Sequence, residues 1–367
     1  MAVAVAVLIG MWVLFTSKPT TPLAAPPTDA LLLEILRLIF YAIAGIGGVV
    51  ALTIAYRKQR LGEAAEARED AKLFTEQFAA AADQLSSDQA ANRLAGVYAM
   101  ASLADDWNRG RQQCVNVLCA YLQLPYEPPT LPEDPTAEQQ AAYKLTAQER
   151  QVRHTIVNII GERLRFEPVR GKTWHWCTFD FERVTFDGGS LHGASFKGHV
   201  SFNQAQFPTG FIGFVGTEFP TGVGFFQAEF SGATVKFIDT KFAGEVCTFY
   251  SAKFTDGIIS FRHAQITADL FNFSQANLSG GSLHFSPNGN LNGARFSEGS
   301  ALFEGACFSG AVVDFQGAQF AGGIVDLREV ADWSVPPNFD AFPNGVPAGL
   351  LLPGKATDAP APPRSPS

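Results

Sequence analysis

One stretch of the chain, residues 200–232, reads VSFNQAQFPTG FIGFVGTEFPTG VGFFQAEFSG. Its phenylalanines fall alternately five and about seven residues apart, and the recurrence continues with small slips to Leu327. Self-similarity at a short period is the sequence signature of a solenoid, in which each unit buries its apolar edge only by stacking on its neighbours. This pattern therefore predicts the fold of the second half of the chain.

Each unit carries two inward pairs of side chains. Residues two apart in a strand point the same way, so the residue two before each phenylalanine shares its direction. This residue is bulky before the first phenylalanine, as at Val200 and Ile212, and small before the second, as at Ala205 and Thr217. Glycines follow the second phenylalanine, where a turning chain needs freedom in φ. We expect a short strand, a corner, a second short strand and a looser corner.

Stacked units would place ring on ring at a spacing of roughly 4.8 Å, with parallel hydrogen bonds between coils. A phenylalanine buried in this way contributes roughly 1.5 to 3 kcal/mol relative to an exposed one. The structural ladder is predicted to comprise Phe202, Phe207, Phe214, Phe219, Phe225, Phe230, Phe237, Phe242, Phe249, Phe254, Phe261, Phe273, Leu278, Phe296, Phe303, Phe308, Phe315 and Phe320. These side chains are expected to form the core of the fold.

Several units have the sequences Ala-Gln-Phe-Pro-Thr (205–209), Ala-Glu-Phe-Ser-Gly (228–232) and Ala-Asn-Leu-Ser-Gly (276–280). They resemble the repeats of the pentapeptide-repeat family, which place Ala two residues before a Leu or Phe. The resemblance implies a right-handed quadrilateral parallel β-helix with one pentapeptide on each side. Beyond Phe202 each pair of pentapeptides carries about two extra residues, which departs from the strict pattern of the family.

Two units are expected to make one coil. On that basis residues 174–327 form roughly six coils with a height of about 30 Å. Along one side the outward residues would then stack as Gln206, Glu229, Lys253 and Asn277, and the slip at residues 286–290 makes an irregular corner.

The beginning of the chain is apolar in two places. Residues 38–56 would span about 28 Å as a helix, close to the roughly 30 Å thickness of bilayer hydrocarbon. Arg57, Lys58 and Arg60 follow at once, so the positive-inside rule places the rest of the chain in the cytoplasm. Residues 2–15 are shorter, and we favour a first short span over a signal peptide there. The expected location is the bacterial cell membrane, with lipid as one partner.

Helical periodicity follows the apolar region. Three apolar stripes occur at Phe74, Phe78, Ala81, Ala82 and Leu85, then at Leu94, Val97, Tyr98 and Ala101, then at Val115, Leu118, Cys119 and Leu122. Ser86 with Gln89 reads as a capping box for the second helix, and Thr146 with Glu149 as one for a later helix. We expect a small helical bundle and a final helix that covers the open strand edge of the first coil.

The sequence thus predicts an α+β membrane protein. Its predicted segments are a membrane anchor (1–62), a helical bundle (63–124), a proline-rich linker (125–146), a capping helix (147–173), the β-helix (174–327), a C-terminal cap (328–352) and a disordered tail (353–367). This arrangement, with the helical sequences FAAAADQL (78–85) and RLAGVYAM (93–100), resembles membrane-anchored pentapeptide-repeat proteins of actinobacteria. That resemblance implies no established activity.

Few residues suggest chemistry. The five cysteines are odd in number and scattered, which suits a reducing compartment, and Cys247 falls at a buried position of the ladder. The six histidines share no recurring column and are expected at the surface. Asp180, Glu182 and Asp187 could imitate a catalytic carboxylate pair, but no base, nucleophile or pocket is tied to them. We therefore expect no catalytic, metal or cofactor site.

Three function classes follow. The first is a non-enzymatic, membrane-tethered scaffold whose solenoid binds an unidentified cytoplasmic protein. The second, implied by the resemblance, is an acidic mimic of duplex DNA that binds topoisomerases; the net charge of −8 fits it and argues against direct nucleic-acid binding, but the expected columns mix charges of both signs. The third, a β-helix enzyme, is disfavoured. Small residues such as Ala44 and Gly48 would let two membrane helices pack, so a homo-oligomer is a further expectation.

Overall fold

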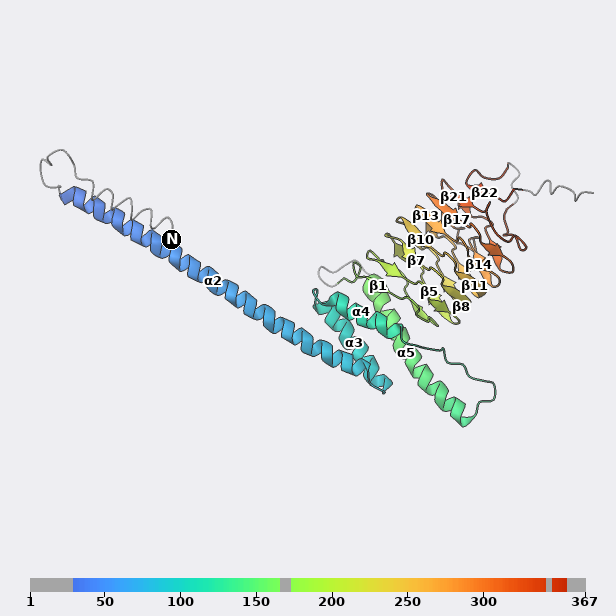
Figure 1. Ribbon diagram of the computed structural model, residues 1–367, viewed down its shortest axis with the longest axis horizontal. Helices are drawn as coiled ribbons and strands as arrows, with labels where there is room; N and C mark the ends of the chain where they lie inside the picture. Colours follow the sequence, from blue (N-terminus) through green and yellow to red (C-terminus); the bar gives the residue numbers. More distant parts are fainter. Residues whose placement is uncertain (1–28, 166–172, 341–344, 355–367) are drawn as a thin grey trace, which may run out of the picture. The chain divides into compact units, whose positions relative to one another are not determined.

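The computed structural model describes residues 29–165, 173–340 and 345–354. It shows an α+β protein in which a helical N-terminal region precedes a parallel β-solenoid (Figure 1). The chain divides into two compact units, residues 1–73 and 74–367. The solenoid and the helices that cover its first coil belong to the second unit.

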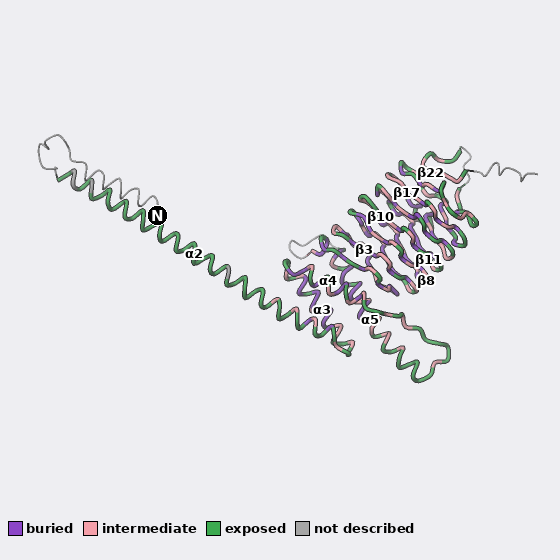
Figure 2. Tube along the Cα trace, in the orientation of Figure 1, coloured by how far each residue is buried: buried purple, intermediate pink, exposed green. Residues whose placement is uncertain are grey.

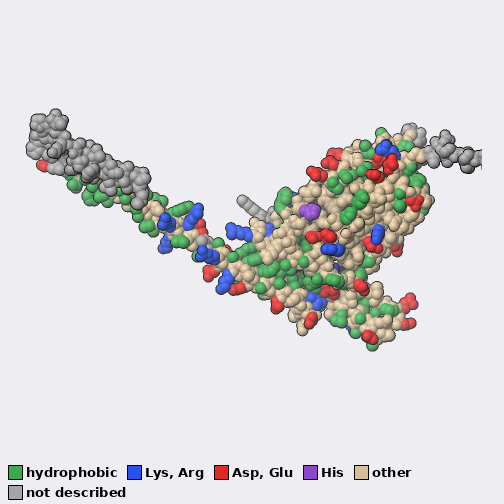
Figure 3. All heavy atoms as spheres, viewed as in Figure 1, with side chains coloured by type: hydrophobic (Ala, Val, Ile, Leu, Met, Phe, Trp, Pro, Cys, Tyr) green, Lys and Arg blue, Asp and Glu red, His purple; other side chains and the backbone are tan. Residues whose placement is uncertain are grey.

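Helix α2 (Asp29–Leu85) contains the whole of the predicted span at residues 38–56. Every residue of that span is exposed, and basic side chains follow it along the helix (Figure 3). Among the described residues, this is the one helix long and apolar enough to cross a membrane, judged by length and composition. The predicted first span at residues 2–15 lies outside the described residues, as do residues 355–367 of the predicted tail.

The end of α2 packs with three further helices, α3 (Ala90–Asp106), α4 (Arg111–Leu122) and α5 (Ala137–Arg165). The approach is close, since a Cβ on Gly96 of α3 would come within 2.7 Å of the Leu85 nitrogen. Most of the predicted apolar stripes lie in this helical core, although Tyr98 is exposed. The buried side chains include Ala81, Leu85, Val97, Met100, Ala101, Val115, Leu118, Cys119, Leu122, Val152, Ile156, Ile160 and Leu164.

Neither predicted capping box is formed. The Ser86 hydroxyl donates to a carbonyl at the end of α2, and Gln89 stands at the N-cap of α3 with no side-chain cap. Thr146 lies inside α5, where its hydroxyl donates to a carbonyl one turn earlier. The capping box of α5 is made by Thr136 and Gln139, each of which accepts the backbone N–H of the other. The helix therefore begins at Ala137 and the linker ends at residue 136, not 146.

Each coil of the solenoid has four short sides, and neighbouring coils pair in parallel. Side 1 holds β1 (Phe179–Asp180), β3 (Val200–Ser201), β7 (Val223–Gly224), β10 (Val246–Thr248), β13 (Leu270–Asn272), β17 (Ser300–Leu302), β21 (Ile324–Asp326) and β22 (Leu350–Leu351). Side 2 holds β4 (Gln206–Phe207), the first halves of β8 (Glu229–Lys236) and β11 (Lys253–Ser260), β14 (Asn277–Leu278) and β18 (Cys307–Phe308). Side 3 holds β2 (Gly189–Ser190), β5 (Phe211–Gly213), the second halves of β8 and β11, β15 (Ser282–His284) and β19 (Val312–Asp314). Side 4 holds β6 (Glu218–Phe219), β9 (Lys241–Phe242), β12 (Gln265–Ile266), β16 (Arg295–Phe296) and β20 (Gln319–Phe320).

The register follows the spacing of the phenylalanines. Glu229 pairs with Lys253 and Lys253 with Asn277, as predicted for two units per coil. Eight strands follow one another along side 1, so the solenoid makes seven turns. The turn that contains residues 286–290 is longer than the others, because Phe315 stacks on Phe285 across 30 positions where regular coils use 23 or 24. The irregular corner predicted there is present.

Both kinds of corner in a unit contain residues with a left-handed backbone, which has positive φ. At the looser corner after the second phenylalanine, glycine was predicted to adopt this conformation, and Gly210, Gly222 and Gly257 do have positive φ there. The tight corner between the first and second phenylalanines also requires positive φ. Several residues other than glycine adopt this conformation there, with φ values between 54° and 60°. They are Arg183, Gln204, Gln227, Asp239, Ser251, His263 and Gln275. Their backbone N–H groups donate to the next coil, as Gln227 does to Tyr250 at 2.9 Å.

Side chains and one backbone carbonyl of α4 and α5 satisfy backbone groups at the open edge of the first coil. The Gln112 amide both donates to the carbonyl and accepts from the N–H of Thr178, at 2.8 Å each, as a neighbouring strand would. Asn158 accepts the N–H of Ser190 on side 3, and the Leu164 carbonyl accepts that of Ser195 on side 4. The helical segment thus takes the place of a preceding coil, and the stacked interior is buried along its length (Figure 2).

The C-terminal segment continues the coil without the repeat motif. Leu350 pairs with Val325 on side 1, Trp333 packs edge-on against Phe308 with centroids 5.4 Å apart, and Phe339 stacks on Phe315. The described residues of the segment predicted as a cap (328–340 and 345–352) cover the preceding coil and contribute to the last turn.

Candidate functional site: the outer sides of the solenoid

The predicted ladder residues lie inside the solenoid in four stacks, one on each side. On side 2 the centroids of Phe207, Phe230 and Phe254 are 4.7 and 4.9 Å apart, with ring planes within 4° of parallel. The stacks are Phe202, Phe225, Phe249, Phe273 and Phe303 on side 1; Phe207, Phe230, Phe254, Leu278 and Phe308 on side 2; Phe214, Phe237, Phe261 and Phe315 on side 3; and Phe219, Phe242, Phe296 and Phe320 on side 4. All are buried except Phe320, which is half-buried.

The stacks also include Phe181, Phe186 and Phe196 of the first coil, which precede the predicted ladder. Within the span of the ladder, two members were missed from the sequence. Phe285 lies between Phe261 and Phe315 on side 3, and Ile266 pairs with Phe242 and Phe296 on side 4. The slip after Phe285 and the change from Phe to Ile both interrupt the pattern. Because the stacks fill the interior, ligands can meet the solenoid only on its outer sides.

The outward residues of sides 2 and 4 are mainly amides and charged groups of both signs. Side 4 carries Glu218, Lys241, Gln265, Arg295 and Gln319 in register. The Lys241 ammonium lies 2.6 Å from the Glu218 carboxylate in an exposed ion pair. Side 2 repeats the mixture, with Glu229 next to Lys253. Neither column is the ordered negative stripe that a mimic of duplex DNA requires.

Side 3 carries an apolar column instead. Its outward residues in register are Phe211, Thr234, Ile258, Ser282 and Val312. The three apolar members stand on alternate coils and are 45 to 49% exposed. The Lys236 ammonium lies 5.0 Å from the centre of the Phe211 ring, a cation–π contact at one end of the column. A flat strand surface with regularly spaced apolar groups is suited to docking another protein.

Side 1, opposite side 3 in the coil, has a second column of this kind. Val246, Leu270, Ser300 and Ile324 lie in register and point outward, and Val246 and Ile324 are exposed. At the adjoining corner the exposed Tyr250 stacks on Phe226. Sequence reasoning missed both columns, although the signal was present in the residue three before the first phenylalanine of each unit.

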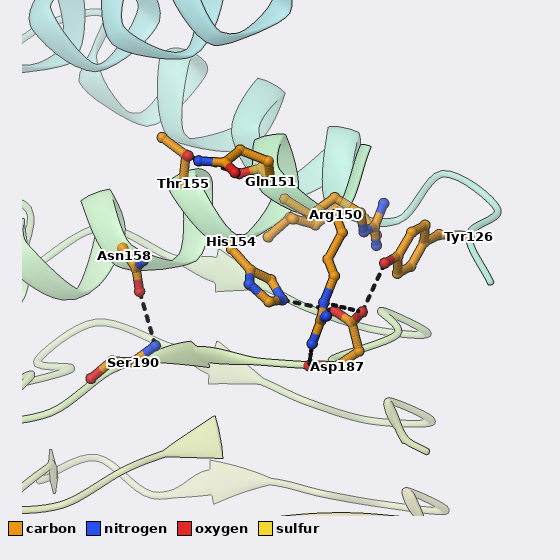
Figure 4. A network of polar contacts seen from close by, with 10 residues as sticks. Tyr126, Arg150, Gln151, His154, Thr155, Asn158, Asp187 and Ser190 are labelled. Atoms are coloured by element: carbon orange, nitrogen blue, oxygen red, sulfur yellow. Dashed lines mark hydrogen bonds and ion pairs between the residues drawn. The ribbon is translucent and has the colours of Figure 1, made fainter. Parts of the chain in front are cut away.

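Asp187 belongs to a polar cluster where α5 meets the first coil (Figure 4). Its side chain is 2% exposed, and it accepts hydrogen bonds from the Tyr126 hydroxyl at 2.8 Å and from His154 Nε2 at 2.9 Å. Arg150 Nε lies 3.0 Å from the same carboxylate. Burial would raise the pKa of Asp187, but the hydrogen bonds from His154 and Tyr126 together with the charges of His154 and Arg150 bring it below the ordinary value.

Asp180, Glu182 and Asp187, which were considered as sources of a catalytic carboxylate pair, do not form one cluster. Asp187 is occupied by the helical cap, and the exposed Asp180 accepts the N–H of Glu182 through its carboxylate. The cap residues Tyr126, Arg150 and His154 were not predicted, since they come from a linker and a helix face with no repeat to mark them. The cluster ties helix to coil with every acceptor of Asp187 engaged, so its geometry is that of a structural contact.

All five cysteines are free, and burial raises the pKa of the Cys247 thiol to about 12, which opposes reactivity. His175 is buried, contrary to the prediction that histidines lie at the surface, and its Nε2 lies 2.9 Å from the Leu164 carbonyl. Among the residues that the structure describes, no group of three or more His, Cys, Asp or Glu side chains is placed to hold a metal ion.

Comparisons of the chain with protein-family models, with curated proteins and with solved structures found no match. The function of the chain is therefore inferred from its own geometry.

Proposed function

We propose that this chain is a non-enzymatic, membrane-tethered protein-binding module of the pentapeptide-repeat type. The observation that carries the proposal is the apolar column of Phe211, Ile258 and Val312 on side 3 of a rigid solenoid. Repeat solenoids commonly act through extended binding surfaces. The Phe stacking and four-sided coil fit the pentapeptide-repeat fold that the repeat sequences imply.

The column has the composition of a recognition surface. Exposed apolar side chains are ordinary when scattered. Here they recur in register on one side and are separated only by the small hydroxyl residues Thr234 and Ser282. A partner strand or helix laid along the axis would meet an apolar group at every second coil, about 9.6 Å apart. The partner proposed is a cytoplasmic protein with an apolar face.

We propose that helix α2 anchors the chain in the membrane. Its apolar stretch at residues 38–56 is exposed and has the length of a bilayer span. The basic residues Arg57, Lys58 and Arg60 would then lie on the cytoplasmic side, together with the solenoid. Under this proposal the module would lie at the bacterial cell membrane and would hold its partner there.

The test is crosslinking in native membranes followed by identification of the crosslinked protein. It compares the wild type with the variant Phe211→Thr, Ile258→Thr and Val312→Thr, whose new residues match the Thr234 already present in the column. We expect the crosslinked protein to be lost from the variant. The control variant Glu229→Gln with Lys253→Gln alters side 2 without changing the net charge and should keep the partner.

Retention of the same partner by the side 3 variant would exclude side 3 as the docking surface. Loss from both variants would also contradict the proposal, since it would show no preference for the apolar column. Far-UV circular dichroism of both purified variants establishes that the solenoid is intact.

A further inference from the structure

A small polar pocket lies on side 4 beside the longest turn of the solenoid. It is lined by His263, Gln265, Asn292, Gly293, Arg295 and Gln319 and has a volume of about 420 Å³. That volume falls within the range of pockets for small molecules. None of these residues belongs to the apolar column on side 3, so the pocket is separate from the proposed protein-docking surface.

The extra residues of the long turn build one wall of the pocket. The chain leaves the regular coil after Phe285 and returns where the Ala294 N–H donates to the Phe285 carbonyl at 2.7 Å. Asn292, at the end of this excursion, accepts the N–H of His263 at 2.9 Å and so takes the place of the usual corner residue. The irregularity in the repeat therefore coincides with the pocket.

The opposite wall is a line of three side chains on successive coils. Gln265 pairs in register with Arg295, and Arg295 with Gln319, so an amide flanks the guanidinium on either side. Arg295 Nε donates to the Ser297 hydroxyl at 3.0 Å, which orients the guanidinium. The amides each offer a donor and an acceptor beside it.

The charges at the pocket leave Arg295 uncompensated. Lys241, the other cation of the side 4 column, is paired with Glu218. At the adjoining corner, the carboxylate of Asp239 is paired with His263 through Nδ1. No carboxylate among the described residues forms an ion pair with Arg295, and an oriented guanidinium is the preferred protein group for binding oxyanions.

We propose that this pocket binds a small hydroxylated oxyanion, with a sugar phosphate as the ligand class. Arg295 holds the phosphate by paired hydrogen bonds. Gln265, Gln319 and Asn292 bind the hydroxyl groups, for which their amides supply both donors and acceptors. His263 lines the same pocket, and its Nδ1 is engaged with Asp239.

Isothermal titration calorimetry on the full-length chain in detergent tests this proposal with four probes. They are glucose 6-phosphate, inorganic phosphate, gluconate and glucose. We expect glucose 6-phosphate to bind most tightly, inorganic phosphate more weakly, and glucose not at all. Tighter binding of gluconate than of glucose 6-phosphate would overturn the phosphate assignment, and equal binding of glucose would overturn the need for an oxyanion.

Two pocket variants and one control complete the test. Arg295→Gln should weaken glucose 6-phosphate binding by at least about tenfold, because a charged hydrogen-bond partner is lost. Gln319→Ala, which leaves the net charge unchanged, should weaken it by a smaller factor. Lys253→Gln removes one positive charge from side 2 and should bind as the wild type does. Absence of binding for all four probes, or equal losses in Arg295→Gln and Lys253→Gln, would overturn the proposal and leave the side 3 docking surface unaffected.

Discussion

Single residues at the tight corners adopt a strained left-handed backbone that the sequence pattern does not reveal. Glycine at the looser corners was foreseeable because a turning chain needs positive φ. Glutamine, serine and histidine at the tight corners could not be predicted, because nothing in their chemistry requires a left-handed backbone. They occupy it because the coil must turn between two stacked rings, and because the resulting N–H groups pair with the next coil. Gln204 and Gln227 add a hydrogen bond between their side chains at 3.1 Å.

Ser251 allows this strain to be measured. It has φ of 55°, its N–H donates to the Ser274 carbonyl, and it occupies the corner position between Gln227 and Gln275 of the neighbouring coils. Ser251→Gly should stabilise the chain by about 0.5 kcal/mol, since relief of the left-handed strain exceeds the entropy that glycine adds to the unfolded state. Ser251→Val should destabilise it by at least about 1 kcal/mol. Chemical denaturation followed by far-UV circular dichroism measures both.

Ser282 provides the matched control. It lies in β15 with an extended backbone, so Ser282→Gly should destabilise the chain by about 0.5 to 1 kcal/mol. Effects of the same sign at both positions would show that the corner is not strained.

Among the helices, the predicted boundaries that were wrong were those based on local capping signals. Thr146 with Glu149 and Thr136 with Gln139 have the same capping-box pattern, and only the second forms. Pro135, directly before Thr136, stops any helix from extending further back, whereas Thr146 is surrounded by good helix formers. The helical cap itself was predictable, because a solenoid needs a covered edge. Its contacts through Gln112, Asn158 and Asp187 were not, because they join segments far apart in the sequence.

The contact between α5 and the first coil should depend on the charge of Asp187. Asp187→Asn should lower the free energy of unfolding at pH 7 by about 1 to 3 kcal/mol, since an amide replaces the buried charged acceptor that Tyr126, His154 and Arg150 share. The pKa of Asp187 is lowered in the folded chain from an ordinary value of 3.8, so the carboxylate stabilises the fold fully above that value. This stabilisation is lost as the pH falls below about 4 through the lower, folded pKa.

Chemical denaturation at pH 7 and at pH 3 measures the difference between wild type and Asp187→Asn, which should shrink at the lower pH. Asp180→Asn is the control, because the exposed Asp180 makes one hydrogen bond to the Glu182 N–H that asparagine can also accept. It should change stability by less than about 0.5 kcal/mol. A variant at Asp187 as stable as wild type at pH 7 would show that the cluster does not anchor the helix.

For the whole molecule, the repeat predicted the periodic features of the solenoid, and it did not predict the features that depart from the period. Coil length, register and the stacked core follow from the spacing of Phe202, Phe207 and their successors. The apolar column of side 3 is equally periodic and could have been found by reading one position further from each phenylalanine. The pocket at Arg295 could not be predicted, because its wall at Asn292 and Gly293 belongs to the one turn that is longer than its neighbours.

We expect the basic residues that follow the apolar stretch to set the orientation of the chain across a membrane. If residues 38–56 span the membrane, Arg57, Lys58 and Arg60 hold the following segment in the cytoplasm, because translocating a cluster of cations is disfavoured. Fusion of green fluorescent protein after Gly354 should give fluorescent cells, and fusion of alkaline phosphatase at the same site should give an inactive enzyme. Replacing the three basic residues by Gln should raise the phosphatase activity. A phosphatase fusion already active with the native residues would place the solenoid outside the cell, where the free cysteines of its core would meet an oxidising environment.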